Sequence, residues 1–176
     1  AHAAAYVMSA FRIAYFKVHH PEVYYATYFS TRFDDFDLET MVRGYDAIKA
    51  KMNEIIAKGY SATNKELSVL ETLKLSLEAT ARGFKFGNID IEKSDGKNFI
   101  IGEDKKTLIC PFRTLDGLGD SVANKIIEER NIKPFYSIED FSLRGHVNGT
   151  TVDKLRSLGV FGNLPETSQL SLFDFV

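Results

Sequence analysis

Hydrophobic side chains recur at helical spacing over most of the first half of this chain. Residues 3–18 are rich in alanine and apolar almost all round, which predicts a helix that is buried on most of its faces. This helix should stop at His19 and His20, because the residue before Pro21 avoids helical backbone angles. A second, short helix can begin with Pro21 in its first turn.

Two longer helices are predicted to follow as an antiparallel pair. The first covers residues 38–58, where apolar side chains share one face, with Asp37 as its N-cap and Gly59 at its C-terminal end. The second opens at residues 63–66, Thr-Asn-Lys-Glu, which form a capping box, and it ends at Gly83. Its apolar side is predicted to consist of Leu67, Leu70, Leu73, Leu77 and Ala81.

The pattern changes near residue 88, where apolar residues begin to alternate with polar ones. Residues 88–112 predict short strands in a small β-hairpin, with Asp95-Gly96 as its tight turn. Beyond residue 115 the pattern returns to short helices, and beyond Asn163 it stops. The predicted fold class is mainly α, in three parts: a helical segment at 1–90, a largely helical domain at 91–165 and an extended C-terminal tail at 166–176.

Composition and charge exclude few functions. The formal net charge of −2 argues against wholesale electrostatic binding of nucleic acid, so any contact with DNA must come from local geometry. Cys110 is the only cysteine, which rules out an internal disulfide and favours a cytosolic setting. No apolar run reaches transmembrane length. The chain starts with alanine and with the pattern of a helix from inside a protein, so we expect a piece of a longer polypeptide.

Two groups of potential metal ligands have structural explanations. Asp34, Asp35 and Asp37 resemble a two-metal carboxylate cluster, but a loop followed by a helix cap accounts for them. Adjacent residues on a helix point apart, so His19 and His20 do not form a zinc pair. We predict no catalytic residue, no metal site and no cofactor within this chain.

The most informative internal motif surrounds Gly117-Leu118-Gly119. It matches a helix-hairpin-helix unit, in which the glycines allow a tight turn, Leu118 points inward and Ala123 lets two helices approach. The amides that follow should face outward at a helix N-terminus, where unpaired N–H groups and the helix dipole favour an anion. DNA phosphate is the anion that such hairpins hold, without reading bases. A plain turn between helices, with glycines for packing alone, is the alternative.

A second, degenerate hairpin is predicted around Gly149, but it lacks the paired glycines. It either contacts phosphate through Lys154 and Arg156 or serves as a structural partner of the first hairpin. The residues predicted to bind the DNA backbone are Gly117, Leu118, Gly119, Asp120, Ser121, Lys125, Gly149, Thr150 and Lys154.

The C-terminal residues Gln169, Leu170, Ser171, Leu172 and Phe173 resemble the pentapeptide by which bacterial replication and repair proteins bind the β sliding clamp. An extended strand would present Leu172 and Phe173 to an apolar pocket, while Gln169 fixes the register through hydrogen bonds. The polar residues before the motif would act as a flexible tether. The alternative is a tail that folds back on its own core.

Residues 1–29, AHAAAYVMSAFRIAYFKVHHPEVYYATYF, resemble the PolC type of DNA polymerase III α subunit, which belongs to the C-family bacterial replicative polymerases. The DFDL run before the long helix, the GLG hairpin and the terminal QLSLF occur in the order typical of that family. The resemblance implies that residues 1–90 are the C-terminal helical part of the fingers. It implies further that 91–165 are a tandem helix-hairpin-helix domain on duplex DNA and 166–176 a clamp-binding tail.

The resemblance also implies an activity for the parent protein, a DNA-directed DNA polymerase. Its Mg²⁺ ions would be held by palm aspartates upstream of this chain, so the chain alone should be inactive. His2, Arg12 and Lys17 lie in the finger segment and are candidates to approach template or triphosphate, or else are plain surface charges. Whether a monovalent cation bridges the hairpin and a phosphate is left open.

The expected partners are primer-template duplex DNA, the β sliding clamp and the rest of the polymerase chain, in the bacterial cytoplasm and without a membrane. Two other functions fit the motifs. One is a separate repair or recombination protein that carries a helix-hairpin-helix and a clamp motif, and the other is an interaction module with no affinity for DNA. An exposed apolar face on the first two helices would speak against a separate repair protein, because that face should pack on missing parts of a polymerase.

Overall fold

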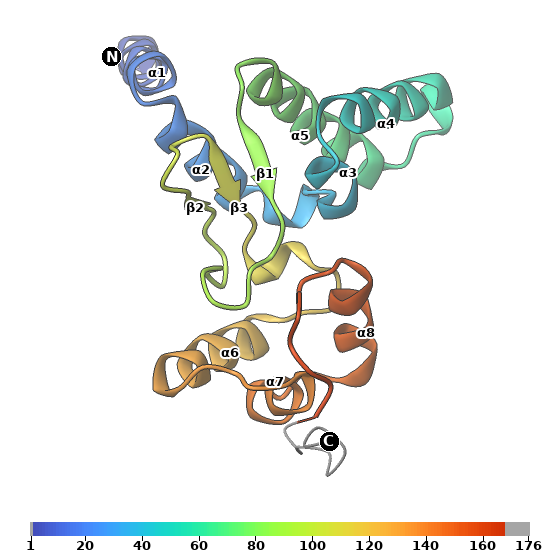
Figure 1. Ribbon diagram of the computed structural model, residues 1–176. Helices are drawn as coiled ribbons and strands as arrows, with labels where there is room; N and C mark the ends of the chain where they lie inside the picture. The colour runs from blue at the N-terminus through green and yellow to red at the C-terminus, as the bar shows by residue number, and fades with distance from the viewer. Residues whose placement is uncertain (1, 168–176) are drawn as a thin grey trace.

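The computed structural model describes residues 2–167, which are mainly helical with one small sheet, as the sequence predicts (Figure 1). The helices are α1 (His2–His19), α2 (Pro21–Thr31), α3 (Leu38–Val42), α4 (Tyr45–Lys58), α5 (Asn64–Ala81), α6 (Asp120–Ile132), α7 (Ile138–Gly145) and α8 (Gly149–Ser157). The strands are β1 (Lys85–Gly87), β2 (Ile100–Ile101) and β3 (Thr107–Ile109). Short 3₁₀ helices are η1 (Phe33–Asp35), η2 (Gly59–Ser61) and η3 (Phe112–Thr114).

Helix α1 has the predicted position, but the predicted burial is wrong. No residue of α1 is buried, and the side chain of Phe11 is 74% exposed. In Figure 1, α1 projects away from the body of the molecule. Helix α2 begins at Pro21 as predicted and buries Tyr25 and Phe29 completely. The apolar surface of α1 therefore lacks a partner within the described residues.

The single helix predicted over residues 38–58 is in fact two helices. Asp37 caps α3 as predicted, since its carboxylate accepts a hydrogen bond from the backbone N–H of Thr40 at 3.1 Å. The helix then breaks at Gly44, which has a φ of +86°. Glycine adopts this angle easily, whereas other residues are strained there. The break interrupts no apolar position, so the hydrophobic pattern does not reveal it.

Helix α5 begins with the predicted capping box and packs against α4. The Thr63 hydroxyl accepts from the Glu66 amide at 3.2 Å, and the Glu66 carboxylate accepts from the Thr63 amide at 2.8 Å. Leu70 and Leu73 are buried, whereas Leu67, predicted on the same face, is 46% exposed. It lies in the first turn, beyond the part of α5 that supplies buried residues.

The sheet has the order β1-β3-β2, with β1 parallel to β3 and β2 antiparallel to it. The predicted hairpin exists, but its turn lies between Gly102 and Lys106 and not at Asp95-Gly96. Asp95 instead stabilises a loop before β2, where its carboxylate accepts from the amides of Lys97 and Asn98. A turn-forming pair thus identifies a turn without identifying which strands it joins.

Aromatic side chains connect the first helices to the sheet. Phe29 of α2 packs edge-on against Phe86 of β1 at a centroid distance of 5.0 Å, and Phe36 packs against Phe99 at 4.9 Å. A separate cluster, in which Phe141 contacts Phe135 and Phe161, lies in the region of α6 to α8. Strand β1 pairs with β3 across the predicted division at residue 90, and the domain limits remain predictions.

Candidate nucleic-acid interface

The first hairpin joins η3 to α6 through a turn that depends on Gly117. Gly117 has a φ of +93°, in the region that favours glycine, while Gly119 is extended with φ −78° and ψ 167°. Leu118 between them is only 3% exposed and Ala123 is 1% exposed. The burial of Leu118 and of Ala123 agrees with the sequence prediction.

The N-terminus of α6, which follows this turn, is open to solvent. Gly119 is its N-cap and supplies no side-chain hydrogen bond to the first turn. A Cβ built on Gly119 would meet nothing within 4 Å, and Gly119, Asp120 and Ser121 are all exposed. Because the first amides of a helix lack intrahelical partners, this surface presents hydrogen-bond donors to an incoming anion.

Asp120 places a carboxylate in the first turn of α6, beside these donors. Arg113 Nη1 lies 2.6 Å from Asp120 Oδ1, and Lys97 Nζ lies 2.9 Å from Asp120 Oδ2. The hydrogen bond from Lys97 and the charge of Arg113 lower the pKa of Asp120. Two cations thus offset the charge of Asp120, which would otherwise repel a phosphate at this end of the helix.

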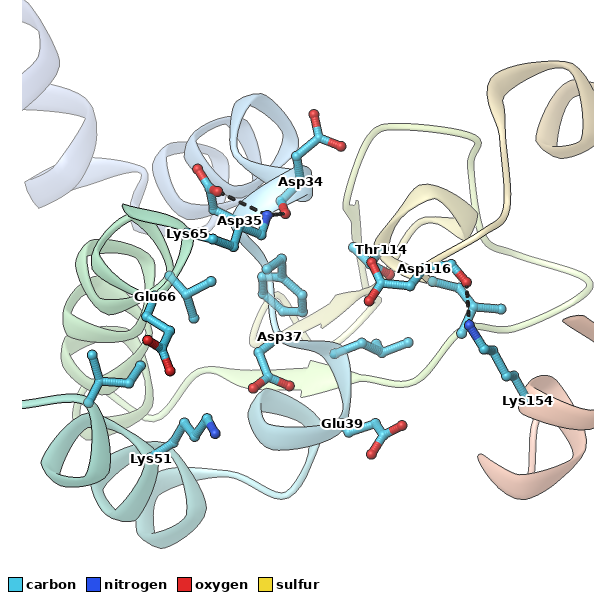
Figure 2. Close-up of a pocket in the computed structure, with 15 residues that line it drawn as sticks. Asp34, Asp35, Asp37, Glu39, Lys51, Lys65, Glu66, Thr114, Asp116 and Lys154 are labelled. Atoms are coloured by element: carbon cyan, nitrogen blue, oxygen red, sulfur yellow. Dashed lines mark hydrogen bonds and ion pairs between the residues drawn. The ribbon is translucent and has the colours of Figure 1, made fainter. Parts of the chain in front are cut away.

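Lys154 reaches from α8 to the first hairpin, where its ammonium group donates to the Asp116 carbonyl oxygen at 2.8 Å (Figure 2). A Cβ on Gly117 would lie 3.9 Å from the same Nζ atom. Lys125 lies further along α6 and forms an ion pair with Glu129 at 2.8 Å, which raises the pKa of Lys125. The fold therefore brings Lys154, and not Lys125, next to the glycine turn.

The second hairpin has the same backbone course as the first, although it lacks the paired glycines. His146 is left-handed, with φ 54°, as Gly117 is in the first hairpin, and Val147 is buried like Leu118. Asn148 is extended, with φ −72° and ψ 157°, and therefore corresponds to Gly119. Gly149 is the first residue of α8, as Asp120 is of α6, so it follows the turn of the second hairpin and lies at the start of the helix.

The spacing of apolar residues is the signal that identifies which residues form the turn of the second hairpin. In the first unit, buried Leu118 is followed by Ala123 and Ile126. In the second, Val147 is followed at the same intervals by Val152 and Leu155, which are also buried. A prediction based on paired glycines does not identify His146 and Asn148, because neither is glycine.

A pocket of about 360 Å³ lies beside the first hairpin, between η1, α3, α4, α5 and α8 (Figure 2). Its charged lining residues are Asp34, Asp35, Asp37, Glu39, Lys51, Lys65, Glu66, Asp116 and Lys154. Lys65 forms an ion pair with Asp35 at 3.2 Å and also donates to the Asp34 carbonyl oxygen. Within the described residues, no group of three or more His, Cys, Asp or Glu side chains is arranged to hold a metal ion. Carboxylates outnumber lysines here, so the pocket disfavours a phosphate.

The three candidate residues of the finger segment lie along α1. His2 packs edge-on against Tyr6, at a centroid distance of 4.6 Å, and Arg12 is exposed. Lys17 instead forms an ion pair with Glu78 of α5 at 2.8 Å, and Glu78 also accepts from the Tyr25 hydroxyl. Partial burial opposes ionisation of Glu78, but the bonds from Lys17 and Tyr25 outweigh it and lower its pKa. Contact of these residues with template or nucleotide stays a prediction.

The predicted clamp motif, Gln169–Phe173, lies outside the described residues. Pro165 and Glu166, a few residues before the motif, are described, and their backbone carbonyls accept hydrogen bonds from the first amides of α7. Among the described residues, no helix is long and apolar enough to cross a lipid bilayer.

Comparison with known proteins agrees with this geometry. Residues 83–170, half of the chain, match the model of the helix-hairpin-helix motif family. The chain therefore belongs to the helix-hairpin-helix proteins, and within them it matches PolC-type DNA polymerase III over nearly its whole length.

Three relatives of that name illustrate the match. The chain is 49% identical to the one from Lacticaseibacillus paracasei over 99% of its length, and 51% identical to the one from Pediococcus pentosaceus over 98%. It is 48% identical to the one from Halalkalibacterium halodurans over 98%. In each case the chain spans 12% of the relative's length, so it corresponds to a fragment of such a protein.

Proposed function

We propose that this chain binds the backbone of duplex DNA for a replicative DNA-directed DNA polymerase and attaches that polymerase to the β sliding clamp. The polymerase reaction itself, with its Mg²⁺ ions, belongs to palm aspartates outside this chain. The proposal rests above all on the open N-terminus of α6 behind Gly119, with Lys154 beside it. Its setting is the bacterial cytoplasm, and its remaining partner is the rest of the polymerase chain.

Duplex binding would use backbone amides and nearby cations. A phosphate oxygen at the N-terminus of α6 would accept hydrogen bonds from the amides of Gly119 to Ser121 and gain from the helix dipole. Lys154 would exchange its bond to the Asp116 carbonyl oxygen for the phosphate. Such contacts carry no base information and would let the polymerase move along any sequence. Gly149 and Thr150, in the first turn of α8, would contact a second phosphate.

The decisive experiment replaces Gly119 by Val and measures affinity for a short duplex as a function of salt. The backbone at Gly119 accepts any residue and the space in front of it is empty, so Gly119→Val should fold normally while its side chain covers the amides. We expect affinity to fall by roughly ten-fold and the salt dependence to weaken by about one phosphate contact. Ala57→Val, at an exposed position of α4, is the control. Unchanged affinity in a folded variant would remove the hairpin from the interface.

Clamp attachment is tested by comparing the whole chain with a version that ends at Thr167. Loss of clamp binding on truncation supports Gln169–Phe173 as the attachment, and Leu172→Ala with Phe173→Ala in the full chain should have the same effect. Equal binding by both versions would mean that the tail serves the fold of this chain instead.

The chain alone should not synthesise DNA, because the palm aspartates are absent from it. Incubation with Mg²⁺, nucleotides and a primed template should give no incorporation. Nucleotide incorporation that depends on this chain would contradict the proposal that the catalytic aspartates lie outside it.

A further inference from the structure

The last described residues are bound to the start of α7. The carbonyl oxygen of Pro165 accepts from the amide of Ile138 at 2.9 Å, and that of Glu166 accepts from the amide of Glu139 at 3.0 Å. The Ser137 hydroxyl accepts from the next amide, that of Asp140, at 3.0 Å. The opening amides of α7, which have no intrahelical partners, are thus satisfied partly by the chain that leads to the tail.

Side chains strengthen this attachment on both sides. Arg156 of α8 donates to the Glu166 carboxylate at 2.9 Å. Phe161 is buried and packs edge-on against Phe141 of α7 at a centroid distance of 5.2 Å, and Leu164 packs on the core. Residues 161–166 are therefore part of the unit that carries the two hairpins. The polar run expected to be a flexible tether is in fact bound to helices up to Glu166.

Only Thr167 and Ser168 separate Glu166 from Gln169, the first residue of the clamp motif. An extended chain spans at most about 3.6 Å per residue, so a connection of this length reaches at most about 11 Å from Glu166. Whatever binds the motif must therefore lie against the end of the domain formed by α7 and α8.

We propose that this anchored exit is a short strut that holds the sliding clamp at a fixed place beside the DNA-binding hairpins. The inference rests on the proposed function, in which Gln169–Phe173 bind the clamp and the hairpins bind duplex. When the clamp is loaded, it lies on the same DNA molecule as the duplex that the hairpins bind. A short connection raises the effective concentration of one binding site for the other, so duplex binding and clamp binding reinforce each other.

Inserting a flexible linker distinguishes the effect of the short connection from the effect of the clamp motif. Sixteen Gly and Ser residues placed between Glu166 and Thr167 keep both the anchor and the pentapeptide but lengthen the connection. The probes are the free β sliding clamp and the same clamp loaded on a nicked circular duplex. We expect affinity for the free clamp to stay within about two-fold, and affinity for the loaded clamp to fall by roughly ten-fold or more, since effective concentration falls steeply with linker length. The same sixteen residues added after Val176 are the matched control and should change neither.

The outcomes distinguish this inference from the proposed function. A loss confined to the loaded clamp supports the strut. Equal affinity of the insertion variant and the control for the loaded clamp overturns the strut and leaves clamp attachment intact. No binding of the free clamp by the unmodified chain overturns the proposed attachment, and the strut with it.

Discussion

At the scale of single residues, Gly117 and Gly119 belong to one hairpin but meet different physical needs. Gly117 has a φ of +93°, where a side chain is strained, whereas Gly119 has a φ of −78°, which any residue adopts. The backbone conformation therefore requires glycine at position 117. At position 119 it does not, and glycine there serves to keep the surface in front of α6 open.

We therefore expect Gly117→Ala and Gly119→Ala to differ in stability. Gly117→Ala should lower the free energy of unfolding by about 1 kcal/mol or more, because alanine is strained at positive φ. Gly119→Ala should change it by less than about 0.5 kcal/mol. Urea unfolding of both variants beside the unmodified chain measures the difference. An equal cost at the two positions would contradict the assignment of the turn.

Asp104 provides a pH-dependent test of the β2–β3 turn. The Thr107 hydroxyl and the amides of Lys106 and Thr107 donate to its carboxylate, and these bonds lower its pKa from 3.8 to about 2. Because the folded pKa lies below the unfolded one, the stabilisation is present above about pH 4 and is lost as the pH falls towards 2. Asp104→Asn should thus lose less stability than the unmodified chain between pH 4 and pH 2. Urea unfolding at several pH values measures this, and parallel profiles would argue against the effect.

At the scale of elements, the two hairpins share a backbone course but differ in how the next helix is capped. Asn148 caps α8, since its side-chain oxygen accepts from the Thr151 amide at 2.9 Å. Gly119 offers no such bond to α6. At the start of α8 a side chain satisfies one of the first amides, whereas at the start of α6 no cap side chain does so. The first hairpin should therefore contribute more to duplex affinity.

Asn148→Ala tests this division between the hairpins. Loss of the cap should lower the free energy of unfolding by about 1 kcal/mol, the usual cost of removing an N-cap side chain. Duplex affinity, measured at a temperature where the variant is folded, should change by less than about two-fold. A loss of affinity as large as that of Gly119→Val would show instead that the two hairpins contribute equally.

The elements that sequence patterns located correctly are those defined by local chemistry. The capping box at Thr63, the N-cap at Asp37 and the start of α2 at Pro21 each depend on a few neighbouring residues, and each was found. Strand β1 pairs with β3, which lies further along the chain than a hairpin connects, so this pairing was not predicted. The paired glycines of the first hairpin identify its turn. In the second hairpin a histidine takes the left-handed position, so the sequence does not show which residues form that turn.

At the scale of the whole molecule, the apolar surface of α1 is the feature least consistent with an isolated protein. Tyr6, Phe11 and Ile13 are each more than half exposed, and Phe16 helps to line an apolar groove against α2. Among residues 2–167, helix α1 is attached to α5 at its C-terminal end, where Lys17 pairs with Glu78. Such a surface on a projecting helix points to a partner, and the remainder of a polymerase chain is the partner that the match to much longer relatives favours.

Phe11→Gln should then have opposite effects in two settings. In this chain, Phe11 is 74% exposed, so the change should reduce self-association without lowering the unfolding temperature. In a complete PolC-type polymerase, where we expect the side chain to be buried, the change should cost about 2 kcal/mol through lost apolar burial. Tyr60→Gln is the control, because Tyr60 is fully exposed on the short helix η2 and should matter in neither setting. Sedimentation measures self-association and thermal unfolding measures stability. Equal stability of the complete polymerase with Phe11→Gln and with Tyr60→Gln would show that α1 does not pack on the polymerase through this face. The apolar residues of α1 would then have to contact another molecule.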